Sequence, residues 1–76
     1  MALEEKQVRQ ILGDAIRNHR KKLGLSQEQV AFDAGLSATY LSLVEQGHRN
    51  VTVYRLALIA DAMGSSVREL AAEASL

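Results

Sequence analysis

Residues 27–45 read QEQVAFDAGLSATYLSLVE, and this stretch decides the fold. A short helix is predicted to end near Asp33 and another to begin at Ser37, so only about three residues join them. Gly35 at the bend supplies the backbone freedom that a sharp turn requires. Ala31 is small where the two helices approach closely, and larger apolar side chains are spaced to pack the helices together: Val30, Leu36, Leu41 and Val44. Two helices joined so tightly form one rigid helix-turn-helix unit.

Outward from this unit, apolar periodicity and well-placed glycines predict an all-α chain of five helices. The first covers about residues 6–23, because its apolar side chains recur every three or four residues before Gly24. Hydroxyl residues that cap helix N-termini open the others, and Ser26 with Gln29 and Ser66 with Glu69 are predicted to form capping boxes. The expected starts are Ser26 for the second helix, Ser37 for the third, Thr52 for the fourth and Ser66 for the fifth.

The 76 residues are predicted to form one domain, residues 1–76, with the helix-turn-helix at about residues 26–46. A chain this short buries a small share of its surface, and no Cys and only two His are present to supply disulfides or a metal site. The fourth helix is apolar on almost every side, which predicts a second apolar contact besides the core. We therefore expect a homodimer formed through about residues 52–76, with these side chains at its interface: Leu58, Met63, Val67, Leu70, Ala71 and Ala74.

Charge is distributed unevenly, although the formal net charge is zero. Residues 17–22 (RNHRKK) contain four Lys or Arg, and no acidic residue occurs between Asp14 and Glu28. This basic run indicates either a solvated helix end that complements the helix dipole or a surface that binds phosphate. No apolar stretch approaches the roughly 20 residues that cross a bilayer, and the N-terminus is polar, so a cytoplasmic protein without membrane contact is expected.

Over about residues 7–72 the chain resembles the lambda-repressor-like helix-turn-helix family, also called the Cro/repressor or XRE family. The run ATYLSLVEQGHRNVT, residues 38–52, looks most like the controller proteins of restriction-modification systems, which typically carry Thr-Tyr, a Ser two residues on, and Arg-Asn after the turn. The resemblance implies a five-helix DNA-binding domain. The implied function is transcriptional regulation by a homodimer on a pseudo-palindromic operator in double-stranded DNA, with RNA polymerase as a further candidate partner.

By the same resemblance, the helix from Ser37 is the recognition helix, whose first turn enters the major groove. Where controller proteins often place an Arg, this sequence has Ala38, so few side chains can make bidentate contacts to bases. DNA shape is therefore expected to carry more of the specificity. The side chains expected to face the bases are Ser37, Ala38, Thr39, Ser42, Leu43 and Arg49.

Phosphate contacts follow from the resemblance and from helix-end physics together. Gln27 matches a family glutamine at the start of the second helix, where free amides and the positive end of the dipole favour an anion. The full set of expected phosphate contacts is Gln27, Tyr40, His48, Asn50, Arg17 and Lys21. Arg20 and Glu45 resemble an internal ion pair of the family that joins the first helix to the end of the third, which would make their role architectural.

Two other classes of function remain to be weighed. The same scaffold serves antitoxins and other protein-interaction modules without an operator of their own, because a fold does not fix a function. An enzyme is not expected, since the sequence has no phosphate-binding loop, no nucleophile elbow and no clustered metal ligands. No cofactor is expected either.

Overall fold

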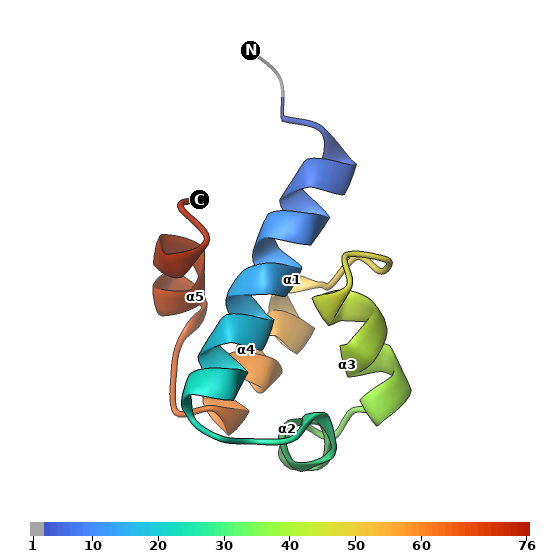
Figure 1. The fold of residues 1–76 in the computed structure, drawn as a ribbon, viewed down its shortest axis with the longest axis vertical. Helices are drawn as coiled ribbons and strands as arrows, with labels where there is room; N and C mark the ends of the chain where they lie inside the picture. Colours follow the sequence, from blue (N-terminus) through green and yellow to red (C-terminus); the bar gives the residue numbers. More distant parts are fainter. Residues whose placement is uncertain (1–2) are drawn as a thin grey trace.

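A computed structural model describes residues 3–76. The expected all-α chain is confirmed there: α1 spans Glu5–Lys22, α2 Gln27–Ala34, α3 Ala38–Glu45, α4 Val53–Ala62 and α5 Val67–Glu73 (Figure 1). Residues 1 and 2 of the predicted domain lie outside the described residues. Among those described, no helix is both long and apolar enough to span a membrane.

The predicted capping residues open four of these helices. The side chains of Ser26, Ser37, Thr52 and Ser66 each accept a hydrogen bond from the backbone amide three residues on. The reciprocal half of the box is present at α2, where the Ser26 amide donates to Gln29 Oε1 at 2.8 Å. The box predicted at α5 is wrong in its second half, because the Glu69 carboxylate accepts from the Ser66 hydroxyl at 3.5 Å instead. Local capping chemistry thus sets the helix starts.

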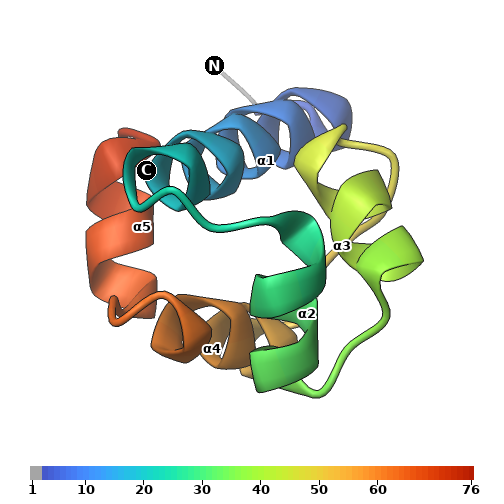
Figure 2. The same ribbon diagram turned by 60° about the horizontal axis from the view of Figure 1, so that its bottom comes forward.

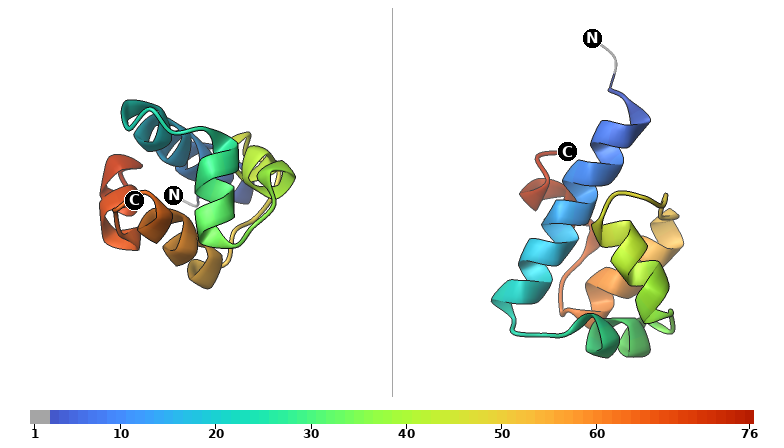
Figure 3. Two further views of the ribbon diagram at one scale, coloured as in Figure 1. Left: turned by 90° about the horizontal axis from the view of Figure 1, so that it is seen from below. Right: turned by 45° about the vertical axis from the view of Figure 1, so that its right-hand side comes forward.

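The helices surround one apolar core, with α1 packed on α3 and α5, α2 on α3 and α4, and α4 on α5 (Figure 2). Figure 1 shows α5 and α3 on opposite sides of α1, and Figure 2 shows them near its opposite ends. Figure 3 shows α2 at the end of the molecule where α1 ends, joined to α3 by a short turn. Gly35 ends α2 in the left-handed conformation with φ 72°, so the turn between α2 and α3 has the backbone geometry that glycine allows.

Gly13, inside α1, lets that helix lie directly on the end of α3. A Cβ atom at this position would lie 2.5 Å from the carbonyl oxygen of Val44 and 2.7 Å from that of Glu45. Real Cβ atoms do not approach backbone oxygens so closely. Gly13 is therefore required because a side chain there would force α1 and α3 apart, and not because of its backbone conformation.

Three of the predicted interface residues belong to the core of the single chain. Met63 and Ala74 are buried, and Leu70 is completely inaccessible to solvent. Their side chains are covered by the chain's own helices, so the apolar surface left for a second subunit is narrower than the sequence suggested. Leu58, Val67 and Ala71 remain half-exposed.

Candidate nucleic-acid interface

A buried ion pair ties α1 to the end of α3, as predicted. Arg20 donates from Nε and Nη2 to the two carboxylate oxygens of Glu45, at 2.7 and 2.9 Å. Its third hydrogen bond, from Nη1, goes to the Leu25 carbonyl at 2.8 Å. Only 8% of Arg20 and 3% of Glu45 are exposed. The pair therefore joins α1, α3 and the segment leading into α2 in a single polar contact.

The hydrogen bonds to Glu45 raise the pKa of Arg20, which outweighs the lowering effect of burial. A base whose pKa is raised on folding stabilises the fold at every pH below its unfolded pKa. The contribution from Arg20 is lost only as the pH rises through the folded value, in strong alkali. The pair is therefore a permanent part of the fold over the neutral range.

Gln27 forms a hydrogen bond with Glu45 of this ion pair, a contact that the position of Gln27 in the sequence did not predict. Its side-chain amide Nε2 donates to Glu45 Oε1 at 3.0 Å, and the residue is half-buried. One N–H of the amide is committed to Glu45, and the backbone amide at the start of α2 remains a free helix-start donor. The ion pair thus positions Gln27 at the same time as it positions α3.

The outward face of α3 carries four side chains at helical spacing: Thr39, Ser42, Leu43 and Gln46. Thr39 and Gln46 are exposed, and Ser42 and Leu43 are half-exposed. Of the other predicted base contacts, Ser37 is exposed at the helix start, whereas Ala38 packs its methyl group against the core. Sequence reasoning missed Gln46, whose amide donates to the Ser42 hydroxyl at 3.0 Å. Its position four residues after Ser42 was the available signal.

A depression of about 200 Å³ lies on one side of this face. It is lined by three predicted phosphate contacts, by the ion pair and by the residue that follows α3: Arg17, Lys21, Gln27, Arg20, Glu45 and Gln46. Because Arg20 is neutralised by Glu45, the charges free to act on an anion here are those of Arg17 and Lys21, both exposed. The depression is therefore electropositive and opens beside the outward face of α3.

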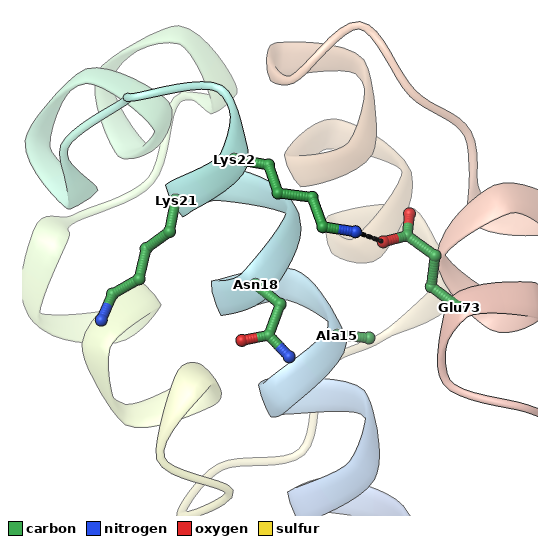
Figure 4. A pocket seen from close by; sticks show the side chains of 5 residues that line it. All are labelled: Ala15, Asn18, Lys21, Lys22 and Glu73. Carbon is green, nitrogen blue, oxygen red and sulfur yellow. Dashed lines mark ion pairs between the residues drawn. The ribbon is translucent and has the colours of Figure 1, made fainter.

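The rest of the basic run faces elsewhere, so the run as a whole does not form one DNA-facing surface. Lys22 lies 4.0 Å from the Glu73 carboxylate of α5, and His19 Nδ1 lies 2.8 Å from it. Figure 4 shows Lys22 reaching toward Glu73 while Lys21 points away from Glu73, although both lysines line a depression between α1 and α5. Glu73 and Glu45 thus divide the run into paired cations and the free pair Arg17 and Lys21.

A second depression, of about 430 Å³, lies on the other side of α3. It brings together the turn, the first turn of α3, the loop after it and the start of α4: Gly35, Leu36, Ser37, Thr39, Tyr40, Leu43, Arg49 and Arg55. The guanidinium carbons of Arg49 and Arg55 lie 5.4 and 5.1 Å from the centroid of the Tyr40 ring. Tyr40 was predicted to bond a phosphate through its hydroxyl, but that hydroxyl donates to the Asn50 carbonyl at 3.3 Å.

The loop that carries His48, Arg49 and Asn50 is anchored to α1. Arg9 Nε donates to the Gly47 carbonyl at 3.0 Å, and Arg9 Nη1 donates to Glu5 at 2.6 Å. The Asn50 side-chain amide contacts the same Glu5 carboxylate at 3.4 Å. These bonds hold an exposed loop beside α3, and nothing in the local sequence pattern pointed to Arg9.

Fold and site together define a helix-turn-helix domain with an exposed second helix. A protein-family model described as Helix-turn-helix matches residues 16–70. The control protein C.SmaI of Serratia marcescens is 41% identical over 63 residues, covering 83% of this chain and 75% of that protein.

Two solved structures extend the comparison. The clp gene regulator ClgR from Corynebacterium glutamicum is 34% identical, with a TM-score of 0.87 over 90% of this chain and 72% of that chain. The restriction-modification controller protein C.AhdI from Aeromonas hydrophila is 39% identical, with a TM-score of 0.79 over 82% of this chain and 94% of that chain.

The chain therefore belongs to the helix-turn-helix family of the XRE type. It is a DNA-binding transcriptional regulator and not an enzyme. The family resemblance over about residues 7–72 is confirmed. The restriction-modification controllers that residues 38–52 resemble are among the relatives.

Proposed function

We propose that the protein acts as a homodimer on a pseudo-palindromic operator and serves as the controller protein of a restriction-modification system. One observation carries the DNA-binding part of this proposal: the outward face of α3 is flanked on both sides by cations that form no ion pair within residues 3–76. Arg17 and Lys21 line the depression on one side, and Arg49 lines the depression on the other. This arrangement suits a helix seated in a major groove, whose two edges are the phosphate backbones.

Base readout falls to Thr39, Ser42 and Leu43, assisted by Ser37 and Arg49. Short hydroxyls make single hydrogen bonds, and the Thr39 methyl and Leu43 suit thymine methyl groups. Because Ala38 packs against the core, it presents little to the bases. Direct readout is therefore thin, and sequence-dependent DNA shape supplies part of the specificity.

Dimerisation is supported by an apolar stripe that the single chain covers only in part. Tyr54, Leu58 and Ala62 recur every four residues along α4, and Tyr54 is 72% exposed. Val67 and Ala71 on the neighbouring α5 extend the stripe with half-exposed apolar side chains. A twofold contact of such stripes would place two recognition helices about 34 Å apart, one turn of DNA.

The controller assignment is supported by the relatives C.SmaI and C.AhdI, which are controller proteins, and by the run at residues 38–52. ClgR, also similar, regulates a clp gene, so similarity alone does not choose the target genes. An endonuclease or methyltransferase gene beside this one would support the controller role. Recruitment of RNA polymerase stays a prediction of this assignment.

Salt-dependent binding tests the proposal directly. If the dimer neutralises about 6–10 phosphates, the logarithm of the affinity should fall with the logarithm of salt concentration at a slope of roughly −5 to −9. Sedimentation at tens of micromolar should show a dimer, and Leu58→Asp should shift it to monomer. A slope near zero would exclude operator binding and favour a protein-interaction module. A monomer both with and without DNA would exclude the homodimer.

A further inference from the structure

Arg55, in the first turn of α4, is an exposed cation that no carboxylate of the described residues neutralises. Its backbone amide donates to the hydroxyl of the N-cap residue Thr52. Among residues 3–76, its exposed side chain forms no ion pair with a carboxylate. By contrast, Glu5 pairs with Arg9, and Glu45 pairs with Arg20. Arg55 therefore presents an uncompensated positive charge.

That charge lies on the DNA-facing side of the domain. Arg55 lines the same depression as Thr39, Leu43 and Arg49, three residues assigned to base readout. In Figure 3, right, the start of α4 passes behind α3, and the 5.1 Å from Arg55 to the Tyr40 ring brings the two elements into contact. A side chain from α4 thus lines the same depression as the first turn of α3.

The Tyr40 ring holds Arg55 in place. The ring is half-buried, and its hydroxyl is bonded to the Asn50 carbonyl, so its orientation is fixed from both ends. Arg49 and Arg55 both contact it, and stacking against an aromatic face restrains an otherwise mobile guanidinium. Successive phosphates of one strand advance about 3.4 Å along the DNA axis, so two guanidinium groups held around one ring can meet neighbouring parts of the same strand.

We propose that Arg55 binds a phosphate of the DNA backbone beside α3, and that the ring of Tyr40 is a positioning group for its guanidinium. The inference rests on the DNA-binding function proposed above and extends the interface beyond the helix-turn-helix to α4. Phosphate, rather than a base edge, is the proposed ligand because Arg55 belongs to α4, whereas α3 is the helix proposed to enter the major groove.

The experiment compares Arg55→Ala with Arg68→Ala, a matched loss of one exposed Arg on α5, on the opposite side of α1 from α3. Fluorescence anisotropy would follow binding at several salt concentrations. Two duplexes of equal length would be used, one selected from random DNA by the wild-type protein and one unrelated. Arg55→Ala should make the slope shallower by about 1 per bound subunit and weaken both duplexes by the same factor. Arg68→Ala should leave the slope at its wild-type value.

The role of the ring is tested in two backgrounds. With Tyr40→Phe, which keeps the ring and loses the hydroxyl, Arg55→Ala should still reduce the slope by about 1 per subunit. With Tyr40→Leu, which removes the ring, the same substitution should have a smaller effect, because the guanidinium is no longer positioned. Thermal melts would confirm that each variant is folded before its binding is compared.

The proposed function, the phosphate contact of Arg55 and the positioning role of Tyr40 would each be refuted by a different result. If the wild-type protein binds without salt dependence, the proposed function fails. If wild type binds as expected but Arg55→Ala matches Arg68→Ala, the phosphate contact is refuted. Altered preference at one base pair would also refute it, in favour of a base contact. Equal effects of Arg55→Ala in the Phe and Leu backgrounds would refute the positioning role of Tyr40.

Discussion

Gly13→Ala measures how tightly α1 is seated on α3. In an unobstructed helix this substitution stabilises by about 0.8–1.0 kcal/mol, because alanine has the higher helix propensity. Here the new methyl group would meet the carbonyl oxygens of Val44 and Glu45 at 2.5 and 2.7 Å. Both belong to the backbone, so neither can rotate aside, and α1 and α3 must separate.

Overpacking of this kind costs about 1–3 kcal/mol. The cost exceeds the gain in propensity over most of its range, so we expect a net loss of up to about 2 kcal/mol in the free energy of unfolding. For a chain of this size, where 1 kcal/mol shifts Tm by about 4–8 °C, that corresponds to a fall in Tm of up to about 16 °C. The displaced end of α3 also carries Glu45, so the pairing with Arg20 should weaken along with the packing.

Circular dichroism melts at matched protein concentrations provide the assay, because dimerisation makes Tm depend on concentration. Asn18→Ala is the control, since Asn18 is exposed on the same helix and alanine should raise helix propensity there without a clash. A Gly13→Ala protein that melts at or above the wild-type Tm would refute the close approach of α1 and α3.

Three further substitutions test other parts of the site. Glu45→Ala leaves the buried guanidinium of Arg20 unpaired and should lower the free energy of unfolding by roughly 3–5 kcal/mol; adding Arg20→Met should restore part of it in denaturant titrations, and no restoration would contradict the ion-pair reading. Arg49→Ala should cost about 1–3 kcal/mol of binding and relax discrimination at one symmetric pair of operator positions, whereas an equal loss on every sequence would assign Arg49 to phosphate. Arg9→Met removes the bond to the Gly47 carbonyl and should speed hydrogen exchange in the following loop; unchanged exchange would argue against anchoring.

Helix positions were predictable because their causes are local. Ser26, Ser37 and Thr52 each accept a hydrogen bond from a backbone amide only three residues away. A short stretch of sequence is therefore enough to predict where α2, α3 and α4 begin. The left-handed Gly35 likewise needs no information from elsewhere in the chain. The pair Arg20 and Glu45 was predictable only through the family resemblance, since the residues are 25 positions apart.

The contacts that were missed depend on how the helices are placed in space. Apolar periodicity shows which side of a helix is buried, but not which backbone oxygen it meets, so the role of Gly13 was hidden. Likewise, Gln27 reads as an exposed helix start until Glu45 is brought next to it. Leu70 was assigned to the dimer interface because an apolar stripe does not reveal whether the same chain or a second one covers it.

A chain of zero net charge can still present a positive surface, because ion pairing decides which charges remain free. Acidic side chains on other elements engage part of the basic set: Glu45 holds Arg20, and Glu73 contacts Lys22. The only acid on α3 is Glu45, and it is buried, so the outward face of that helix carries no negative charge. Salt screens exposed charges beyond a Debye length of about 8–10 Å, so DNA at this face responds to the free cations nearby rather than to the sum over the molecule. The folded structure shows which cations are paired and which are free, and these free cations explain how a chain of zero net charge can attract DNA.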